Sequence, residues 1–166
     1  MSAKRKTKSW REKLANANGL PKVVELEARS SWGHGRCVVP APREVDALMK
    51  KVKPGKLTTI QHLREALSRQ HGTDTACPIT TGIFAWIAAH AATEGEQAGE
   101  AKITPWWRTL KTGGELNPKY PGGIEAAAEL LRDEGHTVYQ KGKRWFVRDF
   151  EKSLAALPAP AAKRAR

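Results

Sequence analysis

Residues 103–123 read ITPWWRTLKTGGELNPKYPGG, and this stretch decides the fold. Two adjacent tryptophans, Trp106 and Trp107, follow a proline and precede Arg108. A polar turn at 111–114 and a second turn-rich loop at 117–123 come after them. The sequence therefore predicts a turn-rich segment that is dense in aromatic side chains and has regular structure on both sides.

Apolar residues recur with helical spacing on either side of this segment. Four helices are predicted from this pattern: 42–52, 59–72, 79–92 and 124–134. Residues 93–102 are acidic and rich in glycine, so we expect an exposed loop there that is inserted before the tryptophans. Residues 137–150 are predicted to form a β-hairpin around Lys141-Gly142-Lys143.

The chain before residue 42 is predicted to contain a short helix and two strands. Ser9, with Glu12 three residues later, has the pattern of a capping box at a helix start. Apolar residues at 23–26 and 37–39 predict two short strands separated by a loop with two glycines. Beyond the hairpin, 153–157 is predicted to add a helical turn.

The chain carries 29 basic and 17 acidic residues, which gives a formal net charge of +12 at pH 7. The first 13 residues contain six lysines and arginines and one glutamate, and residues 159–166 contain three more basic residues. Such a charge favours a polyanionic partner, either nucleic acid or an acidic membrane surface. A basic tail that only improves solubility is an equally good interpretation of the termini.

Several classes of protein are disfavoured by composition. No apolar run is long enough for a transmembrane helix, and the basic N-terminus lacks the apolar stretch of a secretory signal. We therefore expect a cytoplasmic protein, associated with the nucleoid if the organism is bacterial. Two cysteines are too few for a disulfide framework, and five scattered histidines lack ligand spacing. No metal and no cofactor is expected.

Four motifs, in order, resemble the C-terminal domain of the O6-alkylguanine-DNA alkyltransferases. Residues 53–59 resemble the start of that family's helix-turn-helix, and 105–108 stand at the place of its Pro-Cys-His-Arg. Residues 120–123 resemble its Tyr-Ser-Gly-Gly, and 130–136 resemble its Leu-Leu-x-x-Glu-Gly ending. The match is closest to the alkyltransferase-like proteins, which replace the reactive cysteine, often by tryptophan.

The resemblance implies a fold that is mainly α with small β elements. It is a winged helix-turn-helix-like alkyltransferase C-terminal domain with an extra N-terminal segment and a C-terminal β-hairpin. In the family, this motif enters the DNA minor groove, a guanine is rotated out of the stack, and a cysteine thiolate takes its alkyl group. Here Trp106 occupies the cysteine position and Trp107 the histidine position. Indole is a poor nucleophile and cannot relay a proton, so alkyl transfer at Trp106 is not expected.

The chain also departs from the family pattern at two further positions. The family's minor-groove arginine falls near Ile79 or Thr80, and its tyrosine at the start of the motif falls on Ile60. Base flipping is therefore the least supported part of what the resemblance implies.

A base pocket is expected from the tryptophan segment and the loop after it. Trp106 would stack on a flipped base, and such stacking contributes about 1–3 kcal/mol. The competing interpretation is that both tryptophans belong to the core, since Trp is usually well buried. The residues assigned to this pocket are Trp106, Trp107, Arg108, Tyr120, Pro121, Gly122 and Gly123.

Polar residues of the expected helix-turn-helix and the following turn are assigned to DNA contacts: Lys56, Thr58, Thr59, Gln61, Thr80, Thr81 and Lys111. Lys119, Lys141, Lys143 and Arg144 are further candidates, and each is equally well explained as a solvated charge. Glu134, which matches the family's glutamate, is assigned a supporting structural role. Cys77 near a helix start is the alternative nucleophile, against a buried thiol as the commoner case.

The leading hypothesis is a non-enzymatic protein that binds double-stranded DNA and recognises alkylated or damaged bases by flipping them into a pocket lined by Trp106. One alternative is an enzyme that performs alkyl transfer or base processing with Cys77. The other is an architectural or regulatory helix-turn-helix protein without base flipping. We expect a monomer that works with other repair proteins and has no membrane partner. The expected organisation is a basic disordered tail at 1–13, an extension packed on the domain at 14–41, the DNA-binding domain at 42–150, and a short helix with a basic tail at 151–166.

Overall fold

The computed structural model describes residues 6–27 and 30–157. The basic ends of the two expected tails, 1–5 and 158–166, lie outside the described residues. The elements, in chain order, are α1 (Trp10–Ala15), β1 (Lys22–Leu26), β2 (Gly35–Val39), α2 (Pro42–Lys50), β3 (Thr58–Thr59), α3 (Ile60–His71), β4 (Thr75–Ala76), α4 (Pro78–Gln97), β5 (Thr109–Leu110), α5 (Gly123–Asp133), β6 (Val138–Lys141) and β7 (Arg144–Val147). The fold is thus mixed α/β, with five helices and small sheets in the described residues.

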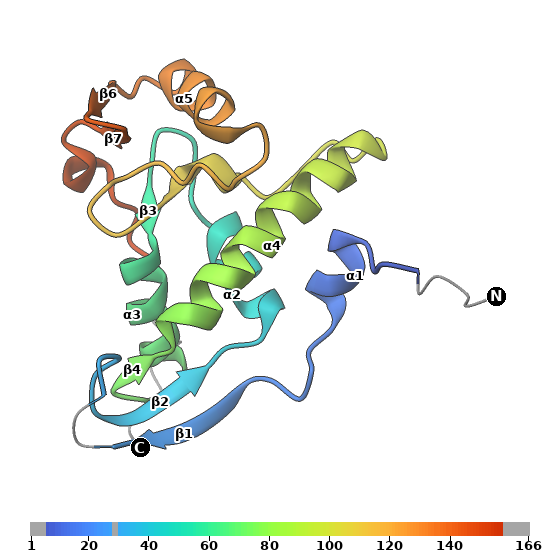
Figure 1. Ribbon diagram of the computed structural model, residues 1–166, viewed down its shortest axis with the longest axis vertical. Coiled ribbons are helices and arrows are strands. Elements are labelled where there is room, and N and C mark those ends of the chain that lie inside the picture. Colours follow the sequence, from blue (N-terminus) through green and yellow to red (C-terminus); the bar gives the residue numbers. More distant parts are fainter. Residues whose placement is uncertain (1–5, 28–29, 158–166) are drawn as a thin grey trace, which may run out of the picture.

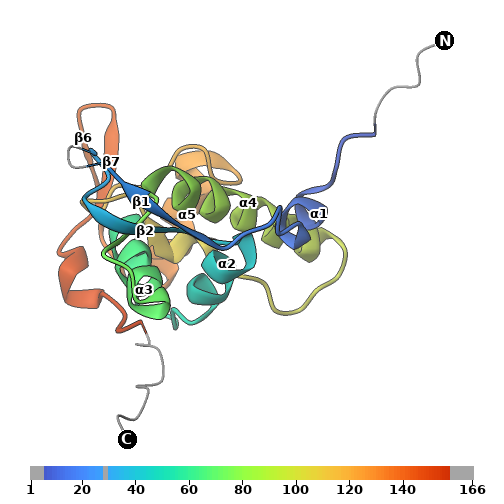
Figure 2. The same cartoon turned by 90° about the horizontal axis from the view of Figure 1, so that it is seen from below.

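Helix α4 runs through the middle of the molecule, and the other elements are arranged around it (Figure 1). The sheet β1-β2-β4 lies at one end, with β1 and β2 antiparallel and β2 and β4 parallel. Helix α5 and the β6–β7 hairpin lie at the other end. Seen from below, α4 and the hairpin are on one side of the molecule, and α2 and α3 are on the other (Figure 2).

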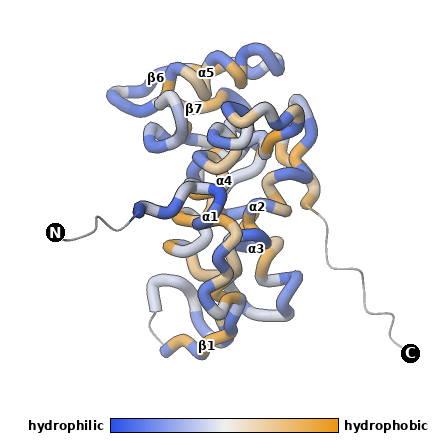
Figure 3. The backbone as a smooth tube through the Cα atoms, turned by 90° about the vertical axis from the view of Figure 1, so that its right-hand side faces the viewer, coloured by the Kyte–Doolittle hydropathy of each residue, from blue (hydrophilic) through white to orange (hydrophobic). Residues whose placement is uncertain are grey.

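The core forms where α4 packs against α2 and α3. Alanines at 85, 88, 89 and 92 follow the helical repeat and are buried. Their small side chains let larger residues of the neighbouring helices approach, and those residues are buried as well: Val45, Leu48, Met49, Leu63 and Leu67. A tube coloured by hydropathy shows that apolar and polar segments alternate along the chain in these helices (Figure 3).

Helix ends form largely where the sequence predicts them. Ser9 and Glu12 form the expected capping box, with each side chain accepting a hydrogen bond from the other residue's backbone N–H. The Thr59 hydroxyl accepts from the backbone N–H of His62, 3.2 Å away, at the start of α3. Gly72 ends α3 with φ +64°, the left-handed conformation that glycine adopts without steric cost.

The predicted strands and the hairpin are confirmed, and the hairpin pairs Val138 with Val147 and Lys141 with Arg144. The end of the chain differs from the prediction. A 3₁₀ turn covers 150–153, where we expected a helical turn at 153–157. The segment instead joins the core beside β3, because the backbone N–H of Leu57 donates to the Ser153 carbonyl and that of Ala155 donates to the Leu57 carbonyl.

Two other predictions of irregular structure are wrong. Helix α4 continues to Gln97, so the expected loop at 93–102 is confined to its last residues. Residues 10–13, expected in a disordered tail, belong to α1. The two errors have one cause. The Glu94 carboxylate accepts hydrogen bonds from the backbone N–H groups of Trp10 and Arg11, both 3.2 Å away, so α4 and α1 hold each other in place.

The capping of α3 can be tested by comparing two threonines. Thr59→Ala removes the acceptor for the His62 backbone N–H, and the free energy of unfolding should fall by about 1 kcal/mol. Thr80→Ala is the matched control, because the Thr80 hydroxyl has no hydrogen-bond partner in the structure. That hydroxyl is buried, so its removal should leave the free energy of unfolding unchanged or raise it. Urea unfolding followed by circular dichroism measures both values, and equal losses would contradict the assigned cap.

Candidate nucleic-acid interface

The two adjacent tryptophans lie in a 3₁₀ turn, 106–108, that packs between α4 and α5. Trp106 is 5% exposed and belongs to the hydrophobic core. Its ring meets the Trp107 ring edge-on at 5.7 Å between centroids and the Tyr120 ring at 6.1 Å. Trp106 therefore has little surface to offer a base without a rearrangement of the core, as the competing interpretation of this residue holds.

Trp107, Arg108 and Glu134 form a polar network behind that core. The Glu134 carboxylate accepts hydrogen bonds from Trp107 Nε1 at 3.1 Å and from Arg108 Nε. Arg108 Nη1 donates to the Val52 carbonyl, 2.7 Å away, and the guanidinium lies over the Trp107 ring. These contacts join the tryptophan turn to the end of α5 and to the segment after α2. Such a set of contacts suits a structural role for Glu134 and Arg108.

The loop assigned as the other pocket wall is a tight turn into α5. Tyr120 is buried, and burial raises the pKa of its phenol well above the usual value. Gly122 has φ +75°, and a Cβ placed there would clash with the Cβ of Ala126. Gly123 also has positive φ, and its backbone N–H donates to the Tyr120 carbonyl. The glycines are thus explained by the turn itself, and Pro121 is only half-buried beside them.

The residues assigned to DNA contacts divide into buried and accessible ones. Thr58, Thr59 and Thr81 are buried, and Thr81 Oγ1 donates to the Cys77 carbonyl at 2.6 Å. Their side chains are therefore not available to a phosphate, and for these three the structure contradicts the prediction. The accessible ones are Lys56, Gln61 and Lys111, which are exposed or half-exposed. Thr80 is half-exposed as a residue, but its hydroxyl is buried, so it also does not offer that group to a phosphate.

Cys77 precedes α4 and is 3% exposed. The other thiol, Cys37, is fully buried in β2, and burial raises its pKa, which disfavours a reactive thiolate. Neither thiol presents its sulfur to a ligand in solution, so the expected role of Cys77 as a buried structural residue fits its surroundings.

The exposed side of α4 borders a groove of about 640 Å³. Its floor is apolar and is formed by Ile79, Ile83 and Trp86 of α4 together with Ile60 at the start of α3. Ile79 is 55% exposed and Ile83 is 44% exposed, although both are large apolar residues. We call this surface the α4 groove. Trp106 does not line it.

The opposite wall of the α4 groove is basic and comes from 111–119 and β7. It is lined by Lys111, Lys119 and Arg144, with one carboxylate, Glu115, among them. Arg144 Nη2 donates to Glu115 Oε1 at 2.8 Å, and Lys111 Nζ lies 3.5 Å from the same oxygen. These cations hold the pKa of Glu115 below its usual value, so the wall keeps a net positive charge at neutral pH.

Sequence reasoning missed the α4 groove because α4 is apolar on most of its circumference. Ile79, Ile83 and Trp86 recur at i, i+4 and i+7, which is the spacing of a helix face. The alanines of the buried face follow the same repeat, so hydropathy did not separate the two faces. Residue size was the available signal, since the small residues pack inside and the large ones remain outside.

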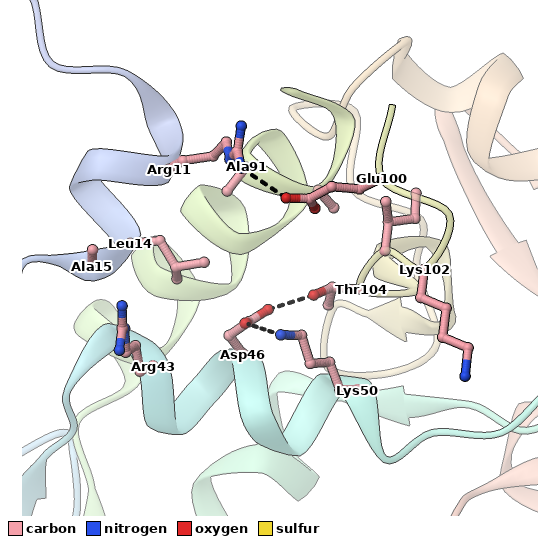
Figure 4. Close-up of a pocket in the computed structure, with 12 residues that line it drawn as sticks. Arg11, Leu14, Ala15, Arg43, Asp46, Lys50, Ala91, Glu100, Lys102 and Thr104 are labelled. Atoms are coloured by element: carbon pink, nitrogen blue, oxygen red, sulfur yellow. Dashed lines mark hydrogen bonds and ion pairs between the residues drawn. The ribbon is translucent and has the colours of Figure 1, made fainter. Parts of the chain in front are cut away.

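A second cavity, of about 200 Å³, lies between α1, α2, the end of α4 and residues 100–104 (Figure 4). Asp46 stands at its centre and accepts a hydrogen bond from Thr104 Oγ1 at 2.6 Å, and Lys50 Nζ lies 3.2 Å from the same carboxylate. Arg11 pairs with Glu100 across the cavity at 2.7 Å. Both carboxylates therefore have partners. The side chains that line the cavity connect α1 and α2 to residues 100–104.

Two further observations concern 6–27 and 30–157, the residues that the structure describes. No group of three or more histidine, cysteine, aspartate and glutamate side chains there has the arrangement of a metal site. Among the helices of this part, none combines the length and the apolar character that crossing a bilayer requires.

No protein-family model matches the sequence. No curated protein matches it either. Two solved structures resemble this chain. One is S. pombe ATL in complex with DNA, with 16% identity, a TM-score of 0.51, and coverage of 69% of this chain and 94% of that chain. The other is S. pombe Atl1 in complex with damaged DNA containing O6-carboxymethylguanine, with 15% identity, a TM-score of 0.48 and the same coverage. At this identity the likeness to S. pombe ATL shows a common fold.

The network around Glu134 predicts a stability effect. Glu134→Ala leaves Arg108 and the Trp107 N–H without their carboxylate partner, and the free energy of unfolding should fall by about 3 kcal/mol. Glu129→Ala removes an equally charged but exposed side chain of the same helix and should change it by less than about 0.5 kcal/mol. Chemical denaturation with tryptophan fluorescence measures both. A loss below 1 kcal/mol for Glu134→Ala would show that the network is not structural.

Proposed function

We propose that this protein binds double-stranded DNA without altering it covalently, and that it recognises alkylated or otherwise damaged bases at the α4 groove. One observation carries the proposal: large apolar side chains of α4 are exposed beside a basic wall. Phosphates attract the basic residues, and the apolar parts of bases and sugars can pack against Ile79 and Ile83. The α3–α4 pair would act as the helix-turn-helix.

Comparison with solved structures supports the choice of DNA as the partner. The S. pombe ATL structure, whose fold this chain has, is a complex with DNA. The order of the four motifs, 53–59, 105–108, 120–123 and 130–136, points in the same direction. The formal charge of +12 suits a polyanionic ligand, and binding should weaken as the salt concentration rises.

Apolar residues would replace the arginine that the alkyltransferase family inserts into the minor groove. Ile79 and Ile83 are one helical turn apart and form a ridge on α4. Apolar wedges of this kind separate adjacent base pairs at a cost of a few kcal/mol per step. A damaged base pair is opened at lower cost, so a ridge of this type would favour damaged sites even before any contact with the lesion.

The lining of the α4 groove suits an alkylated base better than an ordinary one. An alkyl group on O6 of guanine adds apolar surface, and Ile60, Ile83 and Trp86 would remove that surface from water. The Trp86 ring also provides a face or an edge for contact with a base. In this proposal Trp86 has the role that the motif comparison assigned to Trp106, whereas Trp106 remains in the core.

A non-enzymatic role is proposed for two reasons. Indole at 106 and 107 supplies neither a nucleophile nor a proton relay, and Cys77 is buried away from the α4 groove. If the protein is incubated with a duplex that contains O6-methylguanine, its mass should remain unchanged. A gain of one methyl group on Cys77 would overturn this part of the proposal.

The second candidate function is an architectural DNA-binding protein without base flipping. The burial of Trp106 favours it, because the residue expected to receive a flipped base is in the core. A fluorescent adenine analogue, placed in the duplex at the base that faces the α4 groove, distinguishes the two functions. Fluorescence should rise on binding if the base leaves the stack, and it should stay quenched for an architectural protein.

The direct test blocks the α4 groove. A Cβ at Gly82 meets nothing within 4 Å, so Gly82→Glu should fold normally and place a carboxylate in the groove. Affinity for a duplex with one O6-methylguanine should fall at least tenfold, because the added charge repels phosphates and the side chain fills the groove. Gln97→Glu, which adds the same charge at the exposed end of α4, should stay within about twofold.

Fluorescence anisotropy with modified and unmodified duplexes measures these affinities. Wild-type protein should prefer the modified duplex, and Gly82→Glu should lose most of that preference. Equal wild-type affinities for the two duplexes would contradict damage recognition while leaving DNA binding intact. A Gly82→Glu variant that binds like the wild type would show that DNA does not use this groove.

A further inference from the structure

Helix α1 is short but is held to α4 by an unusual number of directed contacts. It has six residues, and none of them is buried, so apolar burial alone does not explain its position. The Glu94 carboxylate accepts hydrogen bonds from the first two backbone N–H groups of the helix, those of Trp10 and Arg11. The Arg11 guanidinium pairs with Glu100 at 2.7 Å (Figure 4). These contacts fix the beginning of the helix on α4.

Trp10 continues the exposed face of α4. Its ring stacks on the His90 ring at 4.4 Å between centroids and meets the Trp86 ring edge-on at 4.7 Å. Trp86 in turn lines the α4 groove. A single aromatic layer therefore connects the beginning of α1 to the groove, although 76 positions separate residues 10 and 86 in the sequence. The segment before Trp10 therefore begins beside this aromatic layer.

That preceding segment is strongly basic. We call residues 2–8 the N-terminal arm, and it contains Lys4, Arg5, Lys6 and Lys8 without any acidic residue. Lys6 and Lys8 are described and exposed, and no carboxylate among the described residues pairs with either of them. The described beginning of the chain, α4 and the hairpin lie on the same side of the molecule, and the last described residues lie on the opposite side (Figure 2).

We propose that the N-terminal arm binds the phosphate backbone of the DNA that occupies the α4 groove. The contacts of Trp10 with α4, including its backbone hydrogen bond to Glu94, hold the arm next to that DNA. The inference rests on the proposed DNA binding and adds a second contact region to it. A segment of seven residues can reach at most about 24 Å, a length that spans several phosphates. Anchoring at Trp10 reduces the conformational freedom that a free tail would lose on binding, so the arm contributes more than its charge alone.

The experiment compares two sets of three basic residues at opposite ends of the chain. Arg5, Lys6 and Lys8 are replaced by alanine in one variant, and Lys163, Arg164 and Arg166 in the other. The dissociation constant for an unmodified duplex is measured by anisotropy at several salt concentrations. Each phosphate contact contributes about 0.9 to the slope of log affinity against log salt. The magnitude of that slope should therefore fall by about 2–3 in the arm variant and by less than 1 in the C-terminal variant.

The anchor is tested without any change in charge. Trp10→Ala removes the stacking on His90 and the contact with Trp86 while the arm keeps all its basic residues. Affinity should fall about fivefold or more, and the slope should fall toward that of the arm variant. Thermal unfolding of Trp10→Ala verifies that the domain remains folded at the binding temperature. The arm variant leaves Trp10 and its contacts unchanged, so it still tests the proposal if Trp10→Ala unfolds.

The outcomes separate the two proposals. Wild-type protein that does not bind DNA at low salt would reject the proposed function and the arm together. If the wild-type protein binds DNA and the arm variant has the same affinity and the same salt slope, only the proposed role of the arm is rejected. Equal losses in the arm and C-terminal variants would also reject it, because general charge would then explain the effect. A lower slope for the arm variant, with normal C-terminal and weakened Trp10→Ala variants, would support the arm at a defined place.

Discussion

The close packing of the alanine face of α4 is the constraint on which the rest of the structure depends. Ala85, Ala88, Ala89 and Ala92 let α2 and α3 approach the helix on one side, so the bulky residues of α4 have to lie on the other. That other side carries Ile79, Ile83, Trp86 and His90, and each has a distinct role. The two isoleucines remain exposed and Trp86 lines the α4 groove, while His90 receives Trp10 from α1. A helix that is apolar on both faces is thus divided by side-chain size into a packing face and a face that borders the α4 groove.

The tryptophan turn has become part of the scaffold of this fold. Trp106 fills the space between α4 and α5, and Trp107 and Arg108 share the carboxylate of Glu134. Trp106, which the motif comparison aligned with the alkyltransferase cysteine, is therefore a core residue and does not line the α4 groove. The chemistry available in the groove is correspondingly simple. Apolar contact, a basic wall and one aromatic ring allow recognition of a nucleic acid, and no cysteine is among the lining residues.

Local signals in the sequence were sufficient for most of the elements but not for the site. Thr59, Gly72 and the Ser9–Glu12 pair define helix ends through contacts within a few residues, so these ends could be predicted. The extension of α4 to Gln97 could not, because it depends on Glu94 binding the backbone of a helix more than 80 residues earlier. Trp106 was assigned to a pocket on the basis of motif order, which does not report burial. Ile79 lies near the expected place of the family arginine, and the sequence had no pattern that separated exposed isoleucines such as Ile79 and Ile83 from core ones.

The six isoleucines of the chain provide the most direct measurement of the central claim. Ile60, Ile79 and Ile83 line the α4 groove, whereas Ile87, Ile103 and Ile124 do not. Their δ1 methyl resonances can be labelled selectively and followed by NMR as a short duplex is added. The three groove methyl resonances should shift or broaden with DNA, and the other three should hold their positions. Shifts confined to Ile87, Ile103 and Ile124, or equal shifts in all six, would contradict the assignment of the exposed face of α4 as the surface that binds DNA.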